Sequence, residues 1–345
     1  VVDFGGSGVV HTTGGVSAII ATKILGARNG RFHDARGRPL KKPKDFPGHS
    51  IALQMLGTFI LWFGWYGFNA GSALSISSNV QSKIASLAAV NTTLSAAMGG
   101  VSALFLKLVI EERRTGEPRF DIVHAMNGCL SGLVSVTAGC AVVEPWAAVV
   151  VGFVAGSLYV GSSELLIRMR LDDAVDAIPV HLFGGVWGVI AVGLLAAPEK
   201  LADAYPLRGG VHPGIFYSWS AGNSDATLLA CQVVSVLFIV GWVSVFMIPF
   251  FIWLNYMGWF RADHLEEMVG LDISYHGIGA GGDGATDEAK MDYVAEFERR
   301  RRQRIRERSQ TNVSEDYEER RPSRVASRTS FSEEEPHTLN IGEEH

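Results

Sequence analysis

Seven apolar stretches dominate the first 257 residues, and each is long enough to cross a lipid bilayer as a single helix. The hydrocarbon layer of a membrane is about 30 Å thick and takes about 20 helical residues to span. These stretches are too long for the strands of a membrane barrel, so the pattern predicts an all-α polytopic membrane protein. The predicted spans lie near residues 4–26, 50–73, 85–109, 122–143, 146–167, 177–197 and 228–257.

Charge separates the chain into a membrane domain and a polar tail. Only 19% of the 345 residues are charged, against about 25% in a typical soluble domain. Residues 258–345 contain 33 of the 65 charged side chains, which predicts a C-terminal tail after a membrane domain of residues 1–257. The Ser-, Arg- and Glu-rich end, from about residue 309 to 345, has the composition of a disordered segment. A net charge of −5 argues against nucleic acid as a partner.

The basic residues between the spans predict how the protein is oriented. Twelve Lys and Arg residues lie in the first, third and fifth loops, whereas three lie in the second, fourth and sixth. Basic loops stay on the cytoplasmic side of a membrane. The alternation therefore places Val1 outside and the C-terminal tail in the cytoplasm, and we expect the protein in the plasma membrane.

Two segments of the chain repeat each other at an offset of 170 residues. The Asp, Val-His and Gly-Gly-Val positions of residues 3–16 recur in residues 173–186. The first and sixth spans contain these segments and, being five spans apart, cross the membrane in opposite senses. Inverted repeats of this kind build many transporters, with the substrate site between the two halves. With five helices in each half, we expect four helices ahead of Val1 and eleven in the complete protein.

The repeat places one histidine in each half. His11 follows Asp3 by eight residues and His181 follows Asp173 by eight, which is about 12 Å along a helix. Because the two helices start from opposite surfaces, we expect both imidazoles near the bilayer centre and within reach of each other. An ionisable residue at that depth is costly and marks a functional site. A single histidine would be more typical of packing, but a symmetric pair favours function.

Three aspartates lie where the helices that carry these histidines begin. Asp3, Asp173 and Asp176 are expected to cap exposed backbone N–H groups and to complement the helix dipole. We therefore predict structural support, and no chemistry, for all three carboxylates.

A mostly aromatic stripe follows one face of the second predicted span. Leu61, Trp65, Phe68 and Ser72 are spaced four, three and four residues apart, so they share a helix face. Such a stripe is often a packing surface. Here a hydroxyl at the outer end lies above aromatic rings, and that arrangement suits a small cation through hydrogen bonding and cation–π attraction.

Other functional classes fit the sequence less well. The three cysteines show no CxxC spacing, and no cluster predicts a metal site, a cofactor or the nucleophile and base of an enzyme. A retinal protein needs a lysine in its last span, and residues 228–257 contain none. A receptor for peptides or amines normally carries Asp/Glu-Arg-Tyr after its third span, where residues 111–114 read Glu-Glu-Arg-Arg.

Several motifs together resemble the Amt/Mep/Rh family of ammonium transporters, most closely its Amt branch. They occur in order over roughly residues 1–280, and their combination is highly specific. The resemblance implies a homotrimer of eleven-helix subunits in the lipid bilayer, with one pore for ammonium or ammonia in each subunit. The motifs are Asp3-Phe4-Gly5-Gly6 with Val10-His11, the run from Trp62 to Ser72, Asn127 to Thr137, Asp172-Asp173 with Asp176, His181 and Gly184-Gly185, and Gly270 to Gly277.

The resemblance also implies a role for each candidate residue. His11 and His181 correspond to twin histidines that line the pore, and Phe68 to the inner phenylalanine of a gate. Ser72 corresponds to the hydroxyl of an external ammonium site, and Asp3 to a buried carboxylate that supports this site. The remaining pore-lining positions are Trp65 and Leu61.

The tail contains a segment that resembles the family's regulatory region. Residues 258–280 correspond to a cytoplasmic segment through which one subunit contacts and gates its neighbour. A kinase is a further expected partner, acting on Ser274 in this segment or on Ser323 and Ser327, which follow arginines. The motif positions of the gating segment are Gly270, Leu271, Asp272 and Ser274.

These observations predict ammonium transport. We expect the protein to recruit NH4+ outside, remove a proton, and pass ammonia through an apolar pore lined by the twin histidines. The alternative is an ammonium sensor on the same fold. The family's outer-site tryptophan and second gate phenylalanine are not found in this chain, so we do not expect it to form a complete pore alone.

Overall fold

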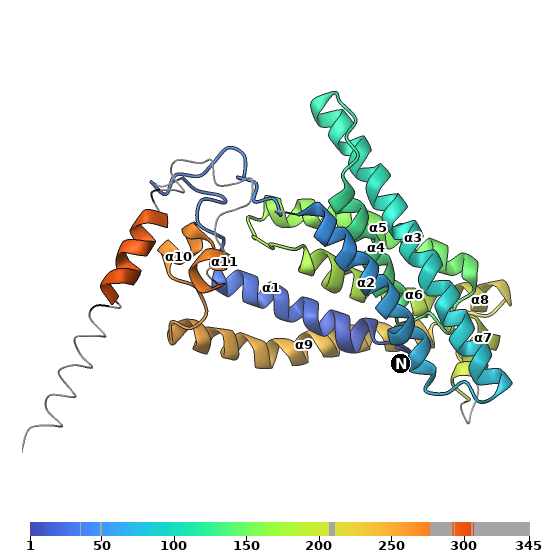
Figure 1. Ribbon diagram of the computed structural model, residues 1–345. Coiled ribbons are helices and arrows are strands. Elements are labelled where there is room, and N and C mark those ends of the chain that lie inside the picture. Colours follow the sequence, from blue (N-terminus) through green and yellow to red (C-terminus); the bar gives the residue numbers. More distant parts are fainter. Residues whose placement is uncertain are drawn as a thin grey trace, which may run out of the picture. The chain divides into compact units, whose positions relative to one another are not determined.

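The structure is a computed structural model that describes residues 1–34, 36–48, 50–206, 211–276, 292, 294–304 and 306. Every regular element in these ranges is a helix, which confirms the predicted all-α fold (Figure 1). Two of the elements, η1 and η3, are π-helical turns, and η2 is a 3-10 turn. In chain order the elements are η1 (Ser7–Thr12), α1 (Thr13–Leu25), α2 (Ile51–Ala70), η2 (Gly71–Ala73), α3 (Asn79–Thr115), α4 (Ile122–Val136), α5 (Pro145–Arg168), η3 (Ile178–Phe183), α6 (Gly184–Leu195), α7 (Pro198–Ala204), α8 (Ile215–Ser220), α9 (Thr227–Tyr256), α10 (His264–Val269) and α11 (Leu271–His276).

The chain divides into two units, Val1–Thr286 and Asp287–His345. All the elements named above belong to the first unit. In the second, residues 294–304 are helical, and arginines pair with glutamates four residues earlier along this helix. The end that we predicted to be disordered, from about residue 309, lies outside the described residues, as do Ser323 and Ser327.

Six helical segments in the described ranges are long and apolar enough to cross a membrane. They coincide with six of the seven predicted stretches, so the protein is a multi-pass membrane protein. The third segment, α3, has 37 residues and extends beyond the predicted range of 85–109 at both ends. The six segments are Ser7–Leu25, Ile51–Ala73, Asn79–Thr115, Pro145–Arg168, Ile178–Leu195 and Thr227–Tyr256.

The remaining stretch, predicted as a span over residues 122–143, is helical only over α4, which corrects that boundary. Residues 137–142 form turns and Val143 pairs with Ala196, and other segments donate hydrogen bonds to the carbonyl groups of residues 137–143. The Asn91 side chain donates to two of these carbonyls at 2.8 Å, and the backbone N–H groups of Phe4 and Gly5 donate to two more. An unpaired carbonyl in lipid costs several kcal/mol, so these partners allow the helix to end early. Hydropathy does not reveal such partners.

α3, α4 and α5 lie together (Figure 1), and glycines allow their backbones to approach closely. A Cβ at Gly132 of α4 or at Gly152 of α5 would collide with the carbonyl oxygen of Ser95 on α3. A Cβ at Gly156, one turn along α5, would collide with the carbonyl oxygen of Gly99. Membrane helices use small residues in this way because lipid supplies no hydrophobic drive for their association. The result is a tight three-helix unit.

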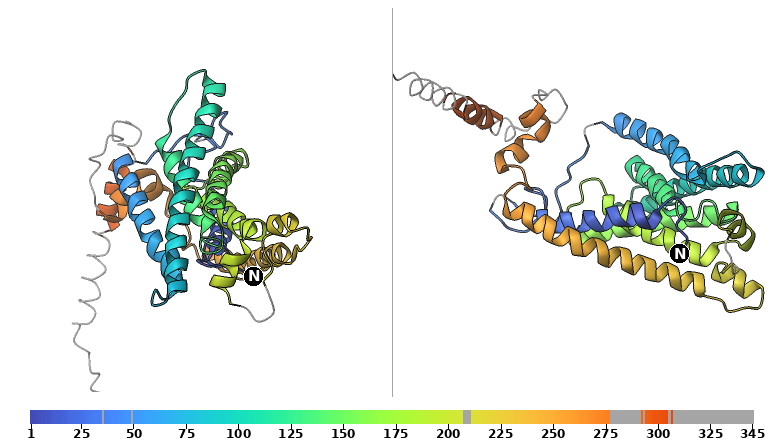
Figure 2. Two further views of the ribbon diagram at one scale, coloured as in Figure 1. Left: turned by 90° about the vertical axis from the view of Figure 1, so that its right-hand side faces the viewer. Right: turned by 90° about the horizontal axis from the view of Figure 1, so that it is seen from below.

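α9 lies beside α1, as the right view in Figure 2 shows. It contributes a fully buried glutamine, Gln232, that binds the backbone just before η1. Gln232 Oε1 accepts from Val2 N at 2.8 Å, and Gln232 Nε2 donates to Val2 O at 2.6 Å and to Val189 O at 3.1 Å. The Gln232 side chain thus supplies hydrogen-bond partners for backbone groups of the non-helical segment that precedes a membrane span.

The two repeated segments cross each other at equivalent glycines. A Cβ at Gly15 would collide with the backbone of Leu182, and a Cβ at Gly185 would lie 2.7 Å from Thr12 Oγ1 and 2.9 Å from Thr12 N. The 170-residue offset relates Gly15 to Gly185 and Thr12 to Leu182, so the two contacts are reciprocal. A two-fold relation between segments produces contacts of this kind. The structure therefore confirms the internal repeat.

We predict that Gly152→Ala destabilises the three-helix unit. The added methyl group has no room against the α3 backbone, and overpacking of this kind typically costs about 1–3 kcal/mol. The expected result is a clear fall in the midpoint of thermal unfolding in detergent.

Gly161→Ala is the matched control on the same helix, because a Cβ at Gly161 meets nothing within 4 Å. This variant should be neutral or slightly stabilising, since alanine has the higher helix propensity by about 1 kcal/mol. Equal unfolding midpoints for the two variants would contradict the packing described above.

Candidate functional site

The two repeated histidines meet where the halves cross. His11 Nδ1 and His181 Nδ1 lie 3.2 Å apart, a hydrogen-bond distance. Their rings are stacked, with centroids 5.2 Å apart and an interplanar angle of 14°. His11 is buried and His181 is half-buried. The structure thus brings together two side chains that are 170 residues apart in the sequence.

This contact determines what the pair offers to a ligand. Only one hydrogen fits between the two Nδ1 atoms, so one neutral ring donates and the other accepts. The donating ring then has a lone pair on Nε2, and the accepting ring has a hydrogen there. His11 Nε2 is buried and has no hydrogen-bond partner within the described part of the chain. Whichever ring donates, the pair presents one acceptor nitrogen and one donor nitrogen.

Two aromatic residues of α2 pack against His11. Trp65 stacks on the imidazole with centroids 5.3 Å apart and an angle of 12°, while Phe68 lies at 5.7 Å with its ring tilted by 43°. The Trp65 Nε1–H group donates to Thr137 Oγ1 at 3.0 Å, at the end of α4, which orients the indole. His11 therefore lies in an apolar, aromatic environment, next to His181.

The other two positions of the predicted stripe lie apart from this cluster. Leu61 is 49% exposed and makes no described polar contact. Ser72 is half-buried, and its hydroxyl donates to the carbonyl oxygen of Phe68 at 2.7 Å. The Ser72 oxygen keeps lone pairs that can accept from a ligand such as NH4+, so the role predicted for it stays a prediction.

Each histidine lies on a π-helical turn that begins after a carboxylate. Asp3 Oδ2 accepts from the backbone N–H of Gly8 at 3.0 Å, and Asp173 Oδ2 accepts from that of Ile178 at 2.6 Å. The two hydrogen bonds are equivalent, because in each half the aspartate accepts from the residue five positions later in the chain. Burial raises the pKa of both carboxyls and outweighs the backbone hydrogen bonds, which lower it. Both aspartates lie where the sequence predicts capping residues.

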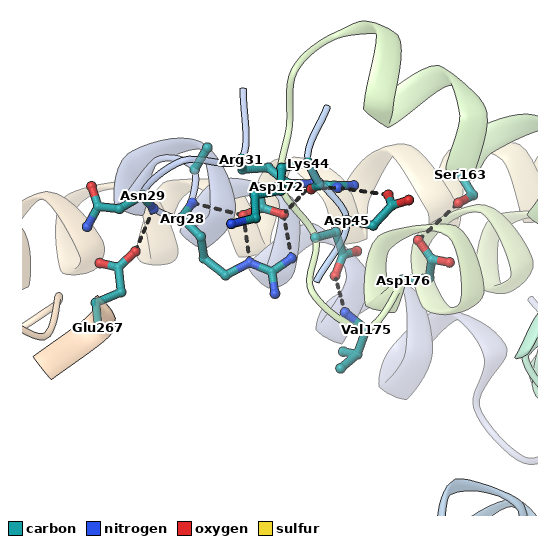
Figure 3. A network of polar contacts seen from close by, with 12 residues as sticks. Arg28, Asn29, Arg31, Lys44, Asp45, Ser163, Asp172, Val175, Asp176 and Glu267 are labelled. Atoms are coloured by element: carbon teal, nitrogen blue, oxygen red, sulfur yellow. Dashed lines mark hydrogen bonds and ion pairs between the residues drawn. The ribbon is translucent and has the colours of Figure 1, made fainter. Parts of the chain in front are cut away.

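Asp176 does not cap a helix, contrary to the prediction. Its carboxylate turns toward α5, where Oδ2 accepts from Tyr159 Oη at 2.9 Å and Oδ1 accepts from Ser163 Oγ at 3.0 Å. Figure 3 shows Ser163 and Asp176 together. The reason is the backbone of Asp176, which has a φ of 56° and directs the side chain away from the N–H groups of η3.

An ion pair that the sequence did not reveal joins the end of α1 to the segment before η3 (Figure 3). Arg28 donates its Nε and Nη2 to the two carboxylate oxygens of Asp172 and its backbone N–H to Oδ2, each at 2.8 Å. Burial raises the pKa of the Asp172 carboxyl, but the hydrogen bonds from Arg28, together with the positive charges of Arg28 and Arg31, outweigh this effect and lower the pKa below its ordinary value. In the sequence, Arg28 counts only as one of many basic residues in a loop.

The C-terminal segment contacts the same end of α1. Arg261 donates to the carbonyl oxygens of Leu25 and Ala27 at 3.0 and 2.8 Å, and it pairs with Glu267 of α10 at 2.9 Å. Glu267 Oε1 also accepts from the backbone N–H of Asn29 at 2.7 Å (Figure 3). α10 is therefore tied directly to the end of α1, the helix that follows the π-helical turn carrying His11.

The predicted gating motif begins where α10 ends. Gly270 has a φ of 102°, a conformation suited to glycine, and separates α10 from α11. Leu271 is exposed. Ser274 donates its backbone N–H to Gly270 O at 3.1 Å, and its buried hydroxyl has no partner among the described residues. The Asp272 side chain lies outside the described part of the structure.

The fold and the site define a class of protein: a multi-pass helical membrane protein in which two inverted segments each contribute one histidine to a central pair. The family model of the Ammonium Transporter Family matches residues 1–280. The chain belongs to this family.

Individual relatives agree with this assignment. The chain is 39% identical over 284 residues to ammonium transporter 1 member 2 of Arabidopsis thaliana, covering 80% of this chain and 52% of the relative. It is 37% identical over 280 residues to ammonium transporter 3 of Dictyostelium discoideum, covering 80% of this chain and 60% of the relative. The chain thus spans about half to three fifths of the length of these relatives.

Solved structures show the same fold. A protein described as a sensor Amt protein matches with a TM-score of 0.63 and 30% identity, over 79% of this chain and 60% of that chain. The crystal structure of Saccharomyces cerevisiae Mep2 matches with a TM-score of 0.60 and 28% identity, over 76% and 53%.

We predict that Asp172→Asn destabilises the protein in a pH-dependent way. Hydrogen bonds to a charged group contribute about 1–3 kcal/mol, and the partial exposure of Arg28 favours the lower end of this range. Because the folded-state pKa lies below the unfolded value, the carboxylate stabilises fully above about pH 4 and loses this effect as the pH falls through the folded pKa. The difference in unfolding midpoint from the wild type should be constant near neutral pH and shrink below about pH 4.

Asp45→Asn is the control, because Asp45 is 95% exposed and lies 3.3 Å from Arg31. An exposed pair contributes less than about 1 kcal/mol, so this variant should match the wild type across the pH range. A pH-independent loss in Asp172→Asn would show that the pairing with Arg28 does not depend on the ionised carboxylate.

Proposed function

We propose that this chain forms part of a transporter that passes ammonium across the plasma membrane, with the C-terminal tail in the cytoplasm. The single observation that supports this best is the His11–His181 contact of 3.2 Å, flanked by Trp65 and Phe68. A ligand beside this pair meets one acceptor nitrogen, one donor nitrogen and apolar rings. Ammonia, which both donates and accepts hydrogen bonds, matches such a surface.

The energetics favour ammonia over the ion as the species that passes the pair. Moving a bare cation into a low-dielectric channel costs far more than a few weak contacts return. Binding NH4+ at an outer site, with Ser72 as a hydrogen-bond acceptor, and transferring its proton to water or to the imidazole pair avoids that cost. Potassium has no proton to lose and is therefore rejected. The coupled imidazoles hold the ammonia, and their protonation state is a property of the pair.

The activity belongs to a larger assembly than this chain. The chain spans about half to three fifths of its relatives, so we propose that the pore is completed by further helices and that three subunits assemble. Leu61, which is 49% exposed here, then faces the lumen that these helices close. Asp3 supports the outer site from beneath η1, while Asp173 holds the other π-helical turn.

Ammonium sensing is the second candidate function. It is supported by the contact of Arg261 and Glu267 with the end of α1, which connects the C-terminal segment to the helix that follows the turn carrying His11. A change at the histidine pair has a direct route to the tail in this arrangement. The gating segment, with Gly270, Leu271, Asp272 and Ser274, would carry the signal or receive it, and a kinase acting on Ser274 would modify it.

We predict that the protein restores growth on low ammonium in a host that lacks its own transporters. The experiment compares this chain alone with the complete coding sequence of its gene. Activity only in the longer form supports the transporter that we propose. Absence of ammonium uptake from a longer form that reaches the membrane would contradict transport and favour sensing.

Within the complete protein, His11→Leu and His181→Leu should each reduce ammonium-dependent current at least tenfold, because a single imidazole no longer presents paired donor and acceptor nitrogens. His212→Ala is the control, since His212 is exposed and pairs with Asp225 away from the crossing. Ammonium-selective currents of wild-type size in both leucine variants would refute the role of the pair.

A further inference from the structure

The two halves of the repeat differ at one position in a way that assigns a role to a carboxylate. Gly6 and Asp176 are equivalent by the 170-residue offset, and each precedes the π-helical turn that carries a histidine. Both have positive φ, 103° for Gly6 and 56° for Asp176. The same backbone bend is therefore made by glycine in one half and by aspartate in the other.

This bend is less favourable for an aspartate than for a glycine. L-residues in the left-handed region lose about 1–2 kcal/mol relative to the right-handed region; aspartate and asparagine adopt it more readily than other L-residues, but only glycine avoids the cost. A glycine at position 176 would relieve the strain, as Gly6 does in the other half. The aspartate side chain must therefore contribute something that glycine lacks.

Its contribution is a set of hydrogen bonds to α5 and, through α5, to α4. The hydroxyl groups of Tyr159 and Ser163, one helical turn apart, each donate to a different oxygen of the carboxylate. Tyr159 is fully buried, and its Oη in turn accepts from Asn127 Nδ2 of α4 at 3.2 Å. Hydrogen bonds to an ionised carboxylate are shorter and stronger than neutral ones.

The backbone of Asp176 continues this attachment into η3. The carbonyl oxygen of Asp176 accepts from Val180 N at 3.1 Å, the residue directly before His181. The start of η3 is thus fixed to the three-helix unit, and His181 lies five residues after the fixed point. In the other half, Gly6 has no side chain, and the preceding segment is held instead by backbone bonds to the end of α4.

We propose that Asp176 is a positioning residue that sets the distance between His181 and His11 by fixing η3 to Tyr159 and Ser163. This inference rests on the proposed function for its transport consequence. Small displacements at a reacting or binding centre have large effects: a misplacement of about 1 Å can reduce the rate by about 100-fold. The outer site at Ser72 lies on a different helix and is not displaced with η3.

The test uses Asp176→Gly in the complete protein, which copies the residue of the other half. The variant relieves the backbone strain and deletes the carboxylate at the same time. We expect the maximal ammonium current to fall at least tenfold, with the half-saturating ammonium concentration within about twofold of the wild type. Backbone hydrogen exchange of residues 178–183 should become faster, while that of residues 7–12 stays unchanged.

Three further variants make the result specific. In Asp176→Asn, the amide oxygen can still accept a hydrogen bond from Tyr159, and asparagine tolerates positive φ. This variant should therefore retain more than half of the maximal current. Tyr159→Phe should reproduce part of the loss. Arg170→Gly relieves the same kind of backbone strain at an exposed position with φ of 56° and should behave as the wild type.

The outcomes separate this inference from the proposed function. If the wild-type protein carries no ammonium, the proposed function fails, and the hydrogen exchange of residues 178–183 alone decides the positioning role. Wild-type exchange and current in Asp176→Gly would overturn the inference. A loss in Asp176→Asn as large as in Asp176→Gly would also overturn it, because the charge and not the position would then be required.

Discussion

Gly15 and Gly185 allow two backbones to cross at a distance that a side chain on either would prevent, and the histidine pair depends on this crossing. The reciprocal contacts place Thr12 against one segment and Leu182 against the other. The two imidazoles lie next to this crossing, on the same side of it along their chains. A larger residue at either glycine would separate the halves and, with them, the two Nδ1 atoms.

Lipid imposes a second requirement, because every backbone group within the membrane needs a partner. The structure meets it with buried or half-buried polar side chains at several places where the helices unwind near the site. Asn91 binds carbonyls after α4, Gln232 binds the backbone before η1, and Asp3 and Asp173 bind the first N–H groups of the two π-helical turns. Irregular backbone next to the histidines is therefore stable despite the apolar surroundings.

The two halves reach similar geometry with different chemistry. The first half uses glycine at its bend and fixes the preceding segment through backbone bonds to the end of α4 and through Gln232, whereas the second uses Asp176 and two hydroxyl groups of α5. The second half is also joined to the end of α1 in the first half, through Arg28 and Asp172. Because α10 contacts that same end of α1, the histidine pair and the C-terminal segment share one structural element.

The sequence alone determined the all-α membrane fold, the repeat and the identity of the two histidines. Apolar stretches of spanning length and an exact spacing of Asp and His in both halves are local patterns, and local patterns can be read from one chain. The predicted meeting of His11 and His181 also followed from counting helical rise from opposite surfaces. The fold class, the repeat and the depth of the two histidines depend on local composition and on the rise of a helix per residue, and neither requires knowledge of neighbouring segments.

Tertiary structure decided the rest, because it depends on contacts between distant residues. Only the folded chain shows that α4 ends at Val136, that Arg28 pairs with Asp172, and that Asp176 binds α5 instead of capping its own helix. A carboxylate beside a helix start satisfies the capping pattern, yet one positive φ angle turns it to Tyr159. That angle, and the hydroxyl groups that stabilise it, come from the packing of another helix and leave no mark on the local sequence.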